Sequence, residues 1–501
     1  MGGDDHRCEW RERAEDLQAQ LDQANATVAT LTEKLTAVEG TLEKLQGHVF
    51  GQRSEKMPTV AQAIRDPARA EAARISALQT RRENAEKKRQ LVTRRIEHKV
   101  REDEKVCPKC GGRDFTRLGD GVASEIYELV AARVERQRHV QEKLRCRCGE
   151  AIITAEGPAR VYDKARFGPT FMAQIAVSKC ADSLPLHRQA KAYRRSGVQV
   201  DDSTLGDLFR RTAELTRPLA DRLLKLVAEK EIVLADETTQ RVQAKGKTRT
   251  AWLWSFIARD ETEKELIAYV FSRSRSGETP VRVLGDTLGK LLVDGYSGYN
   301  KVTVPGGRER AGCFAHLRRK FFDAQSTAPE AAKQAMEYIH DLYRIERAAR
   351  EDDILGTPEH LERRQTDSQA ILDAFEVWLE IEQERYPPKS PIGEAIRYAL
   401  GQWRTLTLFT TDPHLPIDNN ASERALRVSA LGRKNFLFVG HDEAGENLAG
   451  LYSLVATCET NGVNPVDYLA DVLIRVQSHP ASRIDELLPH NWTPPQREPS
   501  A

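Results

Sequence analysis

The feature that most constrains the fold is a change of hydrophobic period in the middle of the chain. Two short apolar runs, 231–236 and 291–294, each end in an aspartate. Between them lie two β-rich stretches, 251–258 and 265–271, and then a helical segment near 277–289. The order strand, strand, strand, helix, strand predicts a mixed α/β sheet in this part of the chain.

Three acidic residues are candidates for chemistry. Asp236 and Asp294 each follow a strand that reads as buried, at the position where sheet folds collect their active sites. Glu423 lies on a predicted helix that begins with the capping-type residues 418–420. Three carboxylates without local cations repel one another, and two Mg2+ or Mn2+ ions, about 3.5–4 Å apart, would relieve that repulsion. The alternative is structural: turn chemistry at the two aspartates, and a pair between Glu423 and Arg427 one helical turn away.

The N-terminal segment carries a heptad pattern. We expect a coiled coil within residues 10–50 that makes the protein a homodimer or a higher oligomer, although the same helix could fold back on its own domain. Residues 59–105 read as a basic linker. The apolar positions of the heptads alternate in steps of four and three: Leu17, Leu21, Ala24, Val28, Leu31, Leu35, Val38, Leu42 and Leu45.

Four cysteines predict a zinc-ribbon-like module over residues 106–158. Thiolates on two tight turns can close a tetrahedral Zn2+ site, and neighbouring glycines let the backbone wrap around the metal. The second pair is C-x-C, which strains joint ligation, so His139 as a ligand or a site with three ligands remains open, as do reduced structural cysteines. The four candidate zinc ligands are Cys107, Cys110, Cys146 and Cys148.

The remaining segments complete the predicted organisation. Residues 160–228 read as helical, with a helix-turn-helix-like pattern around Gly197 that is also common in plain bundles. A helical insertion at 324–400 separates two parts of an α/β domain, 229–323 and 401–476, and a C-terminal tail follows at 477–501. The start of the chain is charged and no apolar run approaches a membrane span, so we expect a cytoplasmic protein.

An ordered series of motifs resembles one known family. The chain resembles the insertion-sequence-sixty-six transposases of the TnpC type, and the resemblance covers most of its length. The motifs are the coiled coil followed by FGQRSEK (50–56), the cysteine pairs, LPLHRQ (184–189), ADET (235–238), DGYSGYN (294–300), GCFAHLRRK (312–320), DNNASERALR (418–427) and GRKN (432–435).

The resemblance implies a D-D-E catalytic core of ribonuclease-H-like fold. Its triad maps onto Asp236, Asp294 and Glu423. It also implies binding of transposon ends, metal-dependent cleavage, attack of the freed 3′-hydroxyl on target DNA, a nucleoid-associated location and small companion proteins. The residues by themselves support only metal-dependent phosphoryl transfer, because the same triad can stop at hydrolysis.

Basic residues near the acids are candidates for phosphate contacts, which position DNA without specifying its sequence. For the basic residues at 318–320, an exposed, solvated helix face is an equal alternative. His316 and Cys313 suggest a metal pair at first sight, but we favour a partly buried histidine and a core cysteine because no second ligand pair is near. The candidates are Arg427, Arg433 and Lys434, and then Arg318, Arg319 and Lys320.

The sequence departs from the family pattern in two places. The C-x-C pair stands where C-x-x-C is expected, which bears on the zinc module. His441 follows Val-Gly where a serine is more usual, and we attach no mechanistic loss to it.

The distribution of charge and the three acids help to decide between rival functions. The formal net charge is only +1, but residues 59–150 hold 22 Lys and Arg against 15 Asp and Glu, and residues 424–434 hold four bases and no acid. A catalytically inactive coiled-coil and zinc-ribbon regulator would not need three carboxylates beside such bases. A ribonuclease-H-like nuclease without strand transfer would not need a dimerising coil, so a transposase accounts best for the whole chain.

Overall fold

The computed structural model describes residues 18, 134, 137–141, 143–145, 152–154 and 157–494. The chain divides into two compact units, Met1–Ala132 and Arg133–Ala501. Apart from Gln18, the predicted coiled coil and the basic linker lie outside the described residues, and so do the four predicted zinc ligands. None of the described helices is long and apolar enough to cross a membrane.

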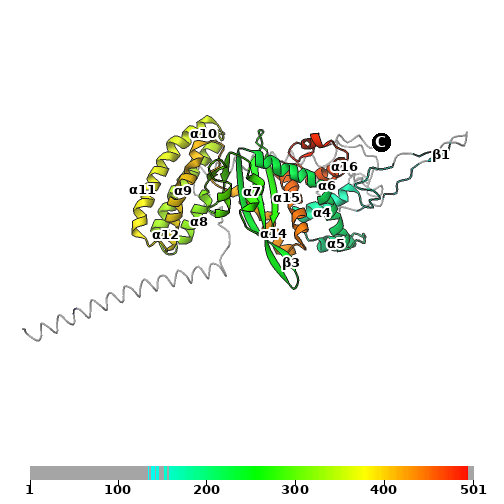
Figure 1. Ribbon diagram of the computed structural model, residues 1–501, viewed down its shortest axis with the longest axis horizontal. Coiled ribbons are helices and arrows are strands. Elements are labelled where there is room, and N and C mark those ends of the chain that lie inside the picture. The colour runs from blue at the N-terminus through cyan, green and yellow to red at the C-terminus, as the bar shows by residue number, and fades with distance from the viewer. Residues whose placement is uncertain are drawn as a thin grey trace, which may run out of the picture. The chain divides into compact units, whose positions relative to one another are not determined.

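A five-stranded sheet with the order β5-β4-β3-β6-β7 forms the centre of the second unit (Figure 1). The first three strands are antiparallel, whereas β6 runs parallel to β3 and β7 runs parallel to β6. The mixed α/β expectation is therefore confirmed. The strands are β3 (Ile232–Ala244), β4 (Lys247–Arg259), β5 (Glu265–Ser272), β6 (Lys290–Leu292) and β7 (Glu309–Ala311).

Helices cover the sheet because its central strands are apolar on both faces. In β4 every residue from Trp254 to Ala258 is buried, a pattern that requires packing partners on both sides. Helix α15 (Asp442–Thr460) also covers the edge strand β5, where the hydroxyls of Ser453 and Thr457 bond to the backbone of Tyr269 and Ile267. These side chains satisfy an edge that would otherwise be open to another strand.

The helices before the sheet are α4 (Pro169–Cys180), α5 (Leu186–Arg195) and α6 (Asp202–Glu229). The turn between α5 and α6 includes Gly197, whose φ of +83° lies in the left-handed region that glycine tolerates best. After the sheet, α16 (Pro465–Arg475) packs on α4. Two short strands, β1 (Lys143–Arg145) and β2 (Ile152–Thr154), pair with each other near the start of the described residues.

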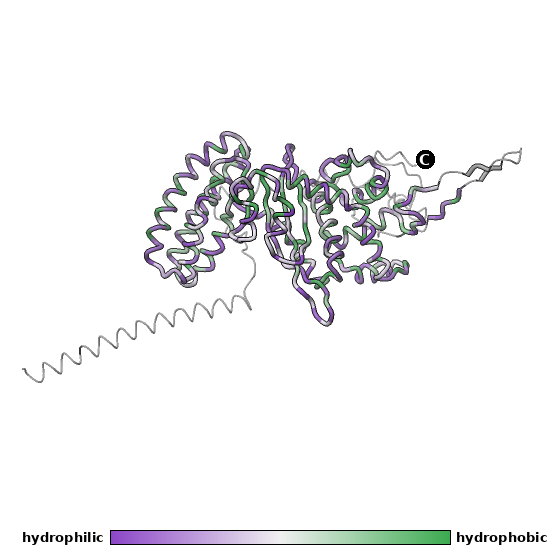
Figure 2. Tube along the Cα trace, viewed as in Figure 1, coloured by the Kyte–Doolittle hydropathy of each residue, from purple (hydrophilic) through white to green (hydrophobic). Residues whose placement is uncertain are grey.

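A group of helices lies between β7 and the later part of the chain. Figure 2 shows hydrophobic and hydrophilic residues alternating along these helices, as expected when one face of each helix is buried. Aromatic side chains form much of their core, with Phe375 in contact with Phe321, Tyr338 and Trp403. The helices are α8 (Phe314–Ala324), α9 (Pro329–Glu351), α10 (Pro358–Arg363), α11 (Gln369–Arg385), α12 (Pro391–Gly401) and α13 (Trp403–Leu406).

One expected position needs correction. Asp236 does not end a strand, because β3 continues for eight more residues to Ala244. The antiparallel partner β4 keeps pairing with β3 along this length, from Leu234–Ile257 to Ala244–Lys247. The polar, threonine-rich residues after Asp236 therefore extend the strand, whereas the parallel partner β6 stops at Leu292, opposite Leu234.

A buried arginine joins α6 to the parallel strands. Arg308 is 1% exposed, and burial lowers the pKa of its guanidinium to about 10. Its Nη2 donates to the carbonyls of Ala228 and Lys230 at 2.7 and 2.8 Å, and its Nη1 donates to the carbonyl of Lys290 at 3.1 Å. The side chain thus satisfies carbonyls at the end of α6 that the helix itself leaves unpaired.

We expect Arg308→Met to lower the free energy of unfolding by about 3 kcal/mol or more, because several buried carbonyls lose a charged donor at once. The matched control is Arg259→Met, since Arg259 is exposed and its ion pair with Glu263 lies on the surface. That change should cost at most about 1 kcal/mol. Urea unfolding followed by circular dichroism measures both, and equal stability of the two variants would contradict this role.

Candidate active site

The sheet register brings the two aspartates together. Leu234 of β3 is paired with Leu292 of β6, and each aspartate lies two residues beyond its leucine. Because side chains alternate along a strand, Asp236 and Asp294 fall on the same face, just beyond the last pair of β3 with its parallel partner β6. The parallel pairing therefore produces the juxtaposition that the two apolar runs predict.

Helix α14 (Asn420–Phe436) brings the third carboxylate to the same place. Glu423 lies in its first turn. The start of the helix is fixed by Asn419, whose Nδ2 donates to the carbonyl of Ala235 at 2.7 Å. The backbone N–H of Asn419 also donates to the Sγ of Cys313 at 3.2 Å, just before α8. Glu423 is thereby held next to the strand that carries Asp236.

The three acids interact electrostatically. The pKa of Asp236 is raised to about 7, first by burial and further by the charges of Glu237, Asp294 and Glu423, while the N–H of Glu237 acts against this shift. Among the described residues, neither Asp236 nor Asp294 takes part in an ion pair, although Arg275 and Arg310 interact electrostatically with Asp294. Such a set of hard oxygen donors fits a divalent cation.

Glu423 has two basic side chains as neighbours in this structure. Arg319 Nη2 lies 3.4 Å from its Oε2, and His316 Nε2 lies 3.8 Å from its Oε1, whereas the described residues show no pair between Glu423 and Arg427. Within the described part of the chain, no three His, Cys, Asp or Glu side chains are already arranged as a metal site. In this structure Glu423 therefore pairs with Arg319 and does not form a ready metal site with the two aspartates.

A second acid beside Asp236 was missed by sequence reasoning. The side chain of Glu237 is 1% exposed, pairs with Arg275 at 2.7 Å and accepts a hydrogen bond from Tyr299 Oη at 2.7 Å. Arg275 in turn stacks on the rings of Trp252 and Tyr296. Glu237 therefore anchors the segment after Asp294, and its presence in the ADET motif next to Asp236 was the available signal.

Arg310 of β7 holds the same segment from the other side. Its Nη2 donates to the carbonyls of Asp294 and Tyr296, and its Nη1 donates to Asn300 Oδ1 at 2.6 Å. The N–H of Tyr296 donates to Asp294 Oδ1 at 2.9 Å. These bonds fix the direction of the Asp294 side chain, and no sequence motif marked Arg310 in advance.

The predicted basic residues on α14 separate into two groups. Arg427 and Lys434 are exposed and lie four and eleven residues after Glu423, which places all three on one helix face. Arg433 points elsewhere, because its Nη1 donates to Thr238 Oγ1 at 2.8 Å and to the carbonyl of Thr239. Arg433 therefore connects α14 to β3.

The basic residues on α8 have partners of different kinds. Arg319 is 61% exposed and pairs with Glu423, while Lys320 Nζ lies 4.7 Å above the ring of Tyr398. Arg318 also belongs to this helix. Cys313 is fully buried and burial raises the pKa of its thiol to about 12, as expected for a core cysteine.

The unusual His441 caps a helix. It is the N-cap residue of α15, and its Nδ1 accepts a hydrogen bond from the N–H of Ala444 at 3.2 Å. A serine at an N-cap accepts the same bond through its hydroxyl. The departure from the family pattern therefore preserves the local structure.

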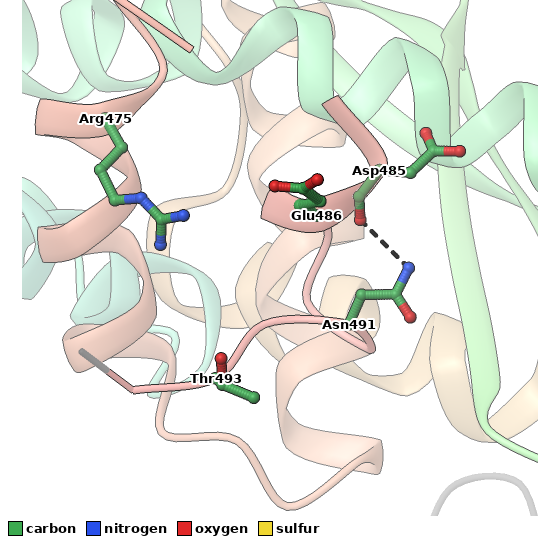
Figure 3. Close-up of a pocket in the computed structure, with 5 residues that line it drawn as sticks. All are labelled: Arg475, Asp485, Glu486, Asn491 and Thr493. Atoms are coloured by element: carbon green, nitrogen blue, oxygen red, sulfur yellow. Dashed lines mark hydrogen bonds between the residues drawn. The ribbon is translucent and has the colours of Figure 1, made fainter. Parts of the chain in front are cut away.

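A pocket of about 370 Å³ lies apart from the acids, near the C-terminal end of the described chain (Figure 3). Its charged groups already have partners: Arg475 pairs with Asp471, and Asp485 pairs with Arg222. Asn491 Nδ2 donates to the carbonyl of Asp485 at 3.1 Å. None of the candidate site residues that the structure describes lines this pocket, so it offers no alternative active site.

Comparison with known families covers most of the chain. The model described as "Transposase IS66 family" matches residues 164–447, which include all three acids. The IS66 C-terminal element matches residues 453–490, and the zinc-finger binding domain of transposase IS66 matches residues 104–149. The last match includes all four cysteines of the predicted module.

Two relatives come from Sinorhizobium fredii (strain NBRC 101917 / NGR234). The uncharacterized protein y4qI is 36% identical over 416 residues, which are 80% of this chain and 76% of the relative. The uncharacterized protein y4hP is 32% identical over 495 residues, which are 91% of this chain and 89% of the relative. On these matches the chain belongs to the IS66 family of transposases.

Proposed function

We propose that Asp236, Asp294 and Glu423 form the D-D-E site of a transposase that cuts DNA at transposon ends and joins the 3′-hydroxyl to target DNA. The observation that carries the proposal is the convergence of three carboxylates on a partly buried Asp236 with which no basic side chain of the described chain pairs. A purely structural aspartate in such surroundings would be expected to have a compensating cation. The family match supplies DNA as the substrate class.

The chemistry follows from what these oxygens can hold. Two Mg2+ or Mn2+ ions bound by the three acids would supply an activated nucleophile and stabilise the leaving oxygen of a phosphodiester. The protein's own part is to keep the donors fixed. Asn419 anchors the start of α14, while Arg310 and Glu237 hold the segment that follows Asp294. Arg319 releases Glu423 at small cost, because exposed ion pairs contribute little.

The sheet order supports a ribonuclease-H-like core. Three antiparallel strands followed by two short parallel strands bring the acids to the point where β3 and β6 diverge. We propose 229–323 and 401–476 as the two parts of this domain and 324–400 as its helical insertion. Arg427 and Lys434 would contact phosphates beside the acids, since they share the exposed face of α14 with Glu423.

The N-terminal part would serve assembly and DNA binding. We propose that the heptads of residues 10–50 dimerise the protein, because a transposase must hold two DNA ends together. The helical region at 160–228 and the zinc-finger domain are candidates for contacts with those ends. Companion proteins of the same element remain part of the proposal.

We expect a loss of more than about 100-fold in metal-dependent nicking of transposon-end DNA for each of three variants: Asp236→Asn, Asp294→Asn and Glu423→Gln. Changes to residues that only support metal ligands cost up to about 100-fold, so loss of a ligand itself should cost more. DNA binding in buffer without added Mg2+ or Mn2+ should persist, because no phosphate contact is removed. Glu380→Gln is the matched control, because Glu380 is an exposed acid on α11. A gel-based nicking assay with Mg2+ measures the rates. If any of the three variants cleaves normally, the assignment of that residue to the site is wrong.

Metal affinity should depend on pH through Asp236. Its folded pKa of about 7 means that the acid is largely protonated at pH 6, so a metal ion must displace a proton there. Apparent Mn2+ affinity should rise about tenfold per pH unit below 7 and level off above it. Calorimetry in two buffers of different ionisation enthalpy would detect the released proton, and a flat profile from pH 6 to 8 would contradict the site.

The zinc module gives a separate prediction. Freshly purified protein should contain about one zinc ion per chain, as four thiolates predict. Cys107→Ser should lose it, whereas Cys458→Ser should retain it, because Cys458 is buried in the core and lies outside the module. Plasma emission spectrometry measures the content, and zinc-free protein would eliminate the proposed ligand set.

A further inference from the structure

The hairpin that joins β3 to β4 extends beyond the sheet (Figure 1). Strand β5 pairs with β4 only from Trp252 onward, and β6 pairs with β3 only up to Leu234. Residues 240–250 therefore pair mainly with each other, with one further parallel bridge between Val242 and Val439. A two-stranded ribbon has little stability of its own in water, so its length calls for a function.

The ribbon is strongly basic. Residues 238–250 include four Lys and Arg and no Asp or Glu. Two of the four are engaged: Arg249 pairs with Asp442, and Arg241 Nη1 donates to Thr250 Oγ1 at 3.1 Å. Lys245 and Lys247 flank Gly246 at the tip, are exposed, and have no hydrogen-bond or ion-pair partner within the described chain. The tip therefore presents two available cations.

The ribbon also runs directly away from the acids. Helix α14 starts beside Ala235 and, after its end, Val439 bonds to Arg241 and Gln243 of the ribbon. Strand and helix thus lead from the same acidic centre to the base of the same ribbon. The exposed Arg427 and Lys434 lie along this path.

We propose that the β3–β4 hairpin is a DNA-binding arm whose Lys245 and Lys247 contact the phosphate backbone away from the cleaved bond. The location relative to cleavage rests on the proposed function of the three acids. Lys245 lies nine positions after Asp236, just beyond the end of β3, which corresponds to about 30 Å at roughly 3.3 Å per residue. At about 3.4 Å per nucleotide this corresponds to about nine base pairs of duplex.

Duplex DNA fits the arm better than an acidic protein surface does. The exposed side chains around the two lysines are Thr and Gln, which bond to phosphate oxygens. Large apolar groups, which would anchor a protein partner, are missing from residues 243–250. Contacts of this kind would add affinity without sequence preference.

The first test is DNA affinity as a function of salt. Full-length protein is titrated, without added Mg2+ or Mn2+ and without chelator, against a duplex of arbitrary sequence and about 40 base pairs, and fluorescence anisotropy gives Kd between about 50 and 300 mM salt. Lys245→Ala/Lys247→Ala should flatten the slope of log K against log salt by about 1.8, since each phosphate contact contributes about 0.9. Lys245→Arg/Lys247→Arg should keep the wild-type slope.

The matched control is Lys333→Ala/Lys389→Ala, which removes the same charge from exposed positions among the helices after β7. If the alanine variant keeps the wild-type slope, the hairpin does not contact DNA phosphates and the proposal is wrong. Because no Mg2+ or Mn2+ is present, this readout does not depend on metal bound by the acids. If the alanine variant shows the flattened slope but the wild-type protein does not cleave DNA with Mg2+, the proposed function of the three acids is wrong and the DNA-binding arm still stands.

The second test asks where along the DNA the arm makes contact. Hydroxyl-radical footprinting on transposon-end DNA should show that the alanine pair loses protection about nine base pairs from the cleaved bond. Loss confined to the bond itself would overturn the proposed reach of the arm. Loss at the expected distance, together with normal protection in the control pair, would support it.

Discussion

The hydrogen bond from Asn419 to the carbonyl of Ala235 is the contact on which the site depends. It joins residues 184 positions apart and ties the first turn of α14 to the strand that carries Asp236. The bond sets the start of α14 and therefore places Glu423 beside β3. Cys313 reinforces the junction by accepting the N–H of Asn419.

Around this junction the protein keeps charges of the same sign close together. Burial and the neighbouring acids raise the pKa of Asp236 to about 7, so its ionised form is costly without a cation. The side chain of the adjacent Glu237 is also buried, but Arg275 compensates its negative charge and Tyr299 donates a hydrogen bond to its carboxylate. Two neighbouring residues of β3 thus differ in their partners, because Glu237 pairs with an arginine and Asp236 pairs with no basic side chain of the described chain. That difference separates a candidate metal ligand from a structural acid.

Much of this arrangement could be predicted from residue pattern. The apolar run 251–258 and the run 265–271 correspond to β4 and β5 because strands buried on both faces are apolar throughout. The extension of β3 past Asp236 could not be predicted, since its Thr, Gln and Arg residues read as a turn and only pairing with β4 makes them a strand. Arg310 was equally hidden, because its role is to donate to backbone carbonyls, which leave no trace in sequence.

The long β3 strand also changes how the net charge of +1 should be understood. Acids gather at its centre and cations at its tip, within one continuous piece of backbone. The ribbon keeps its shape through Val439 and the pair between Arg249 and Asp442, which lie at its base and leave the tip free. A short turn after Asp236 would have been simpler to stabilise. The separation of the two charge clusters along a single strand is therefore what the extra length provides, and it suits a polyanion that must reach the acids and be held at a distance from them.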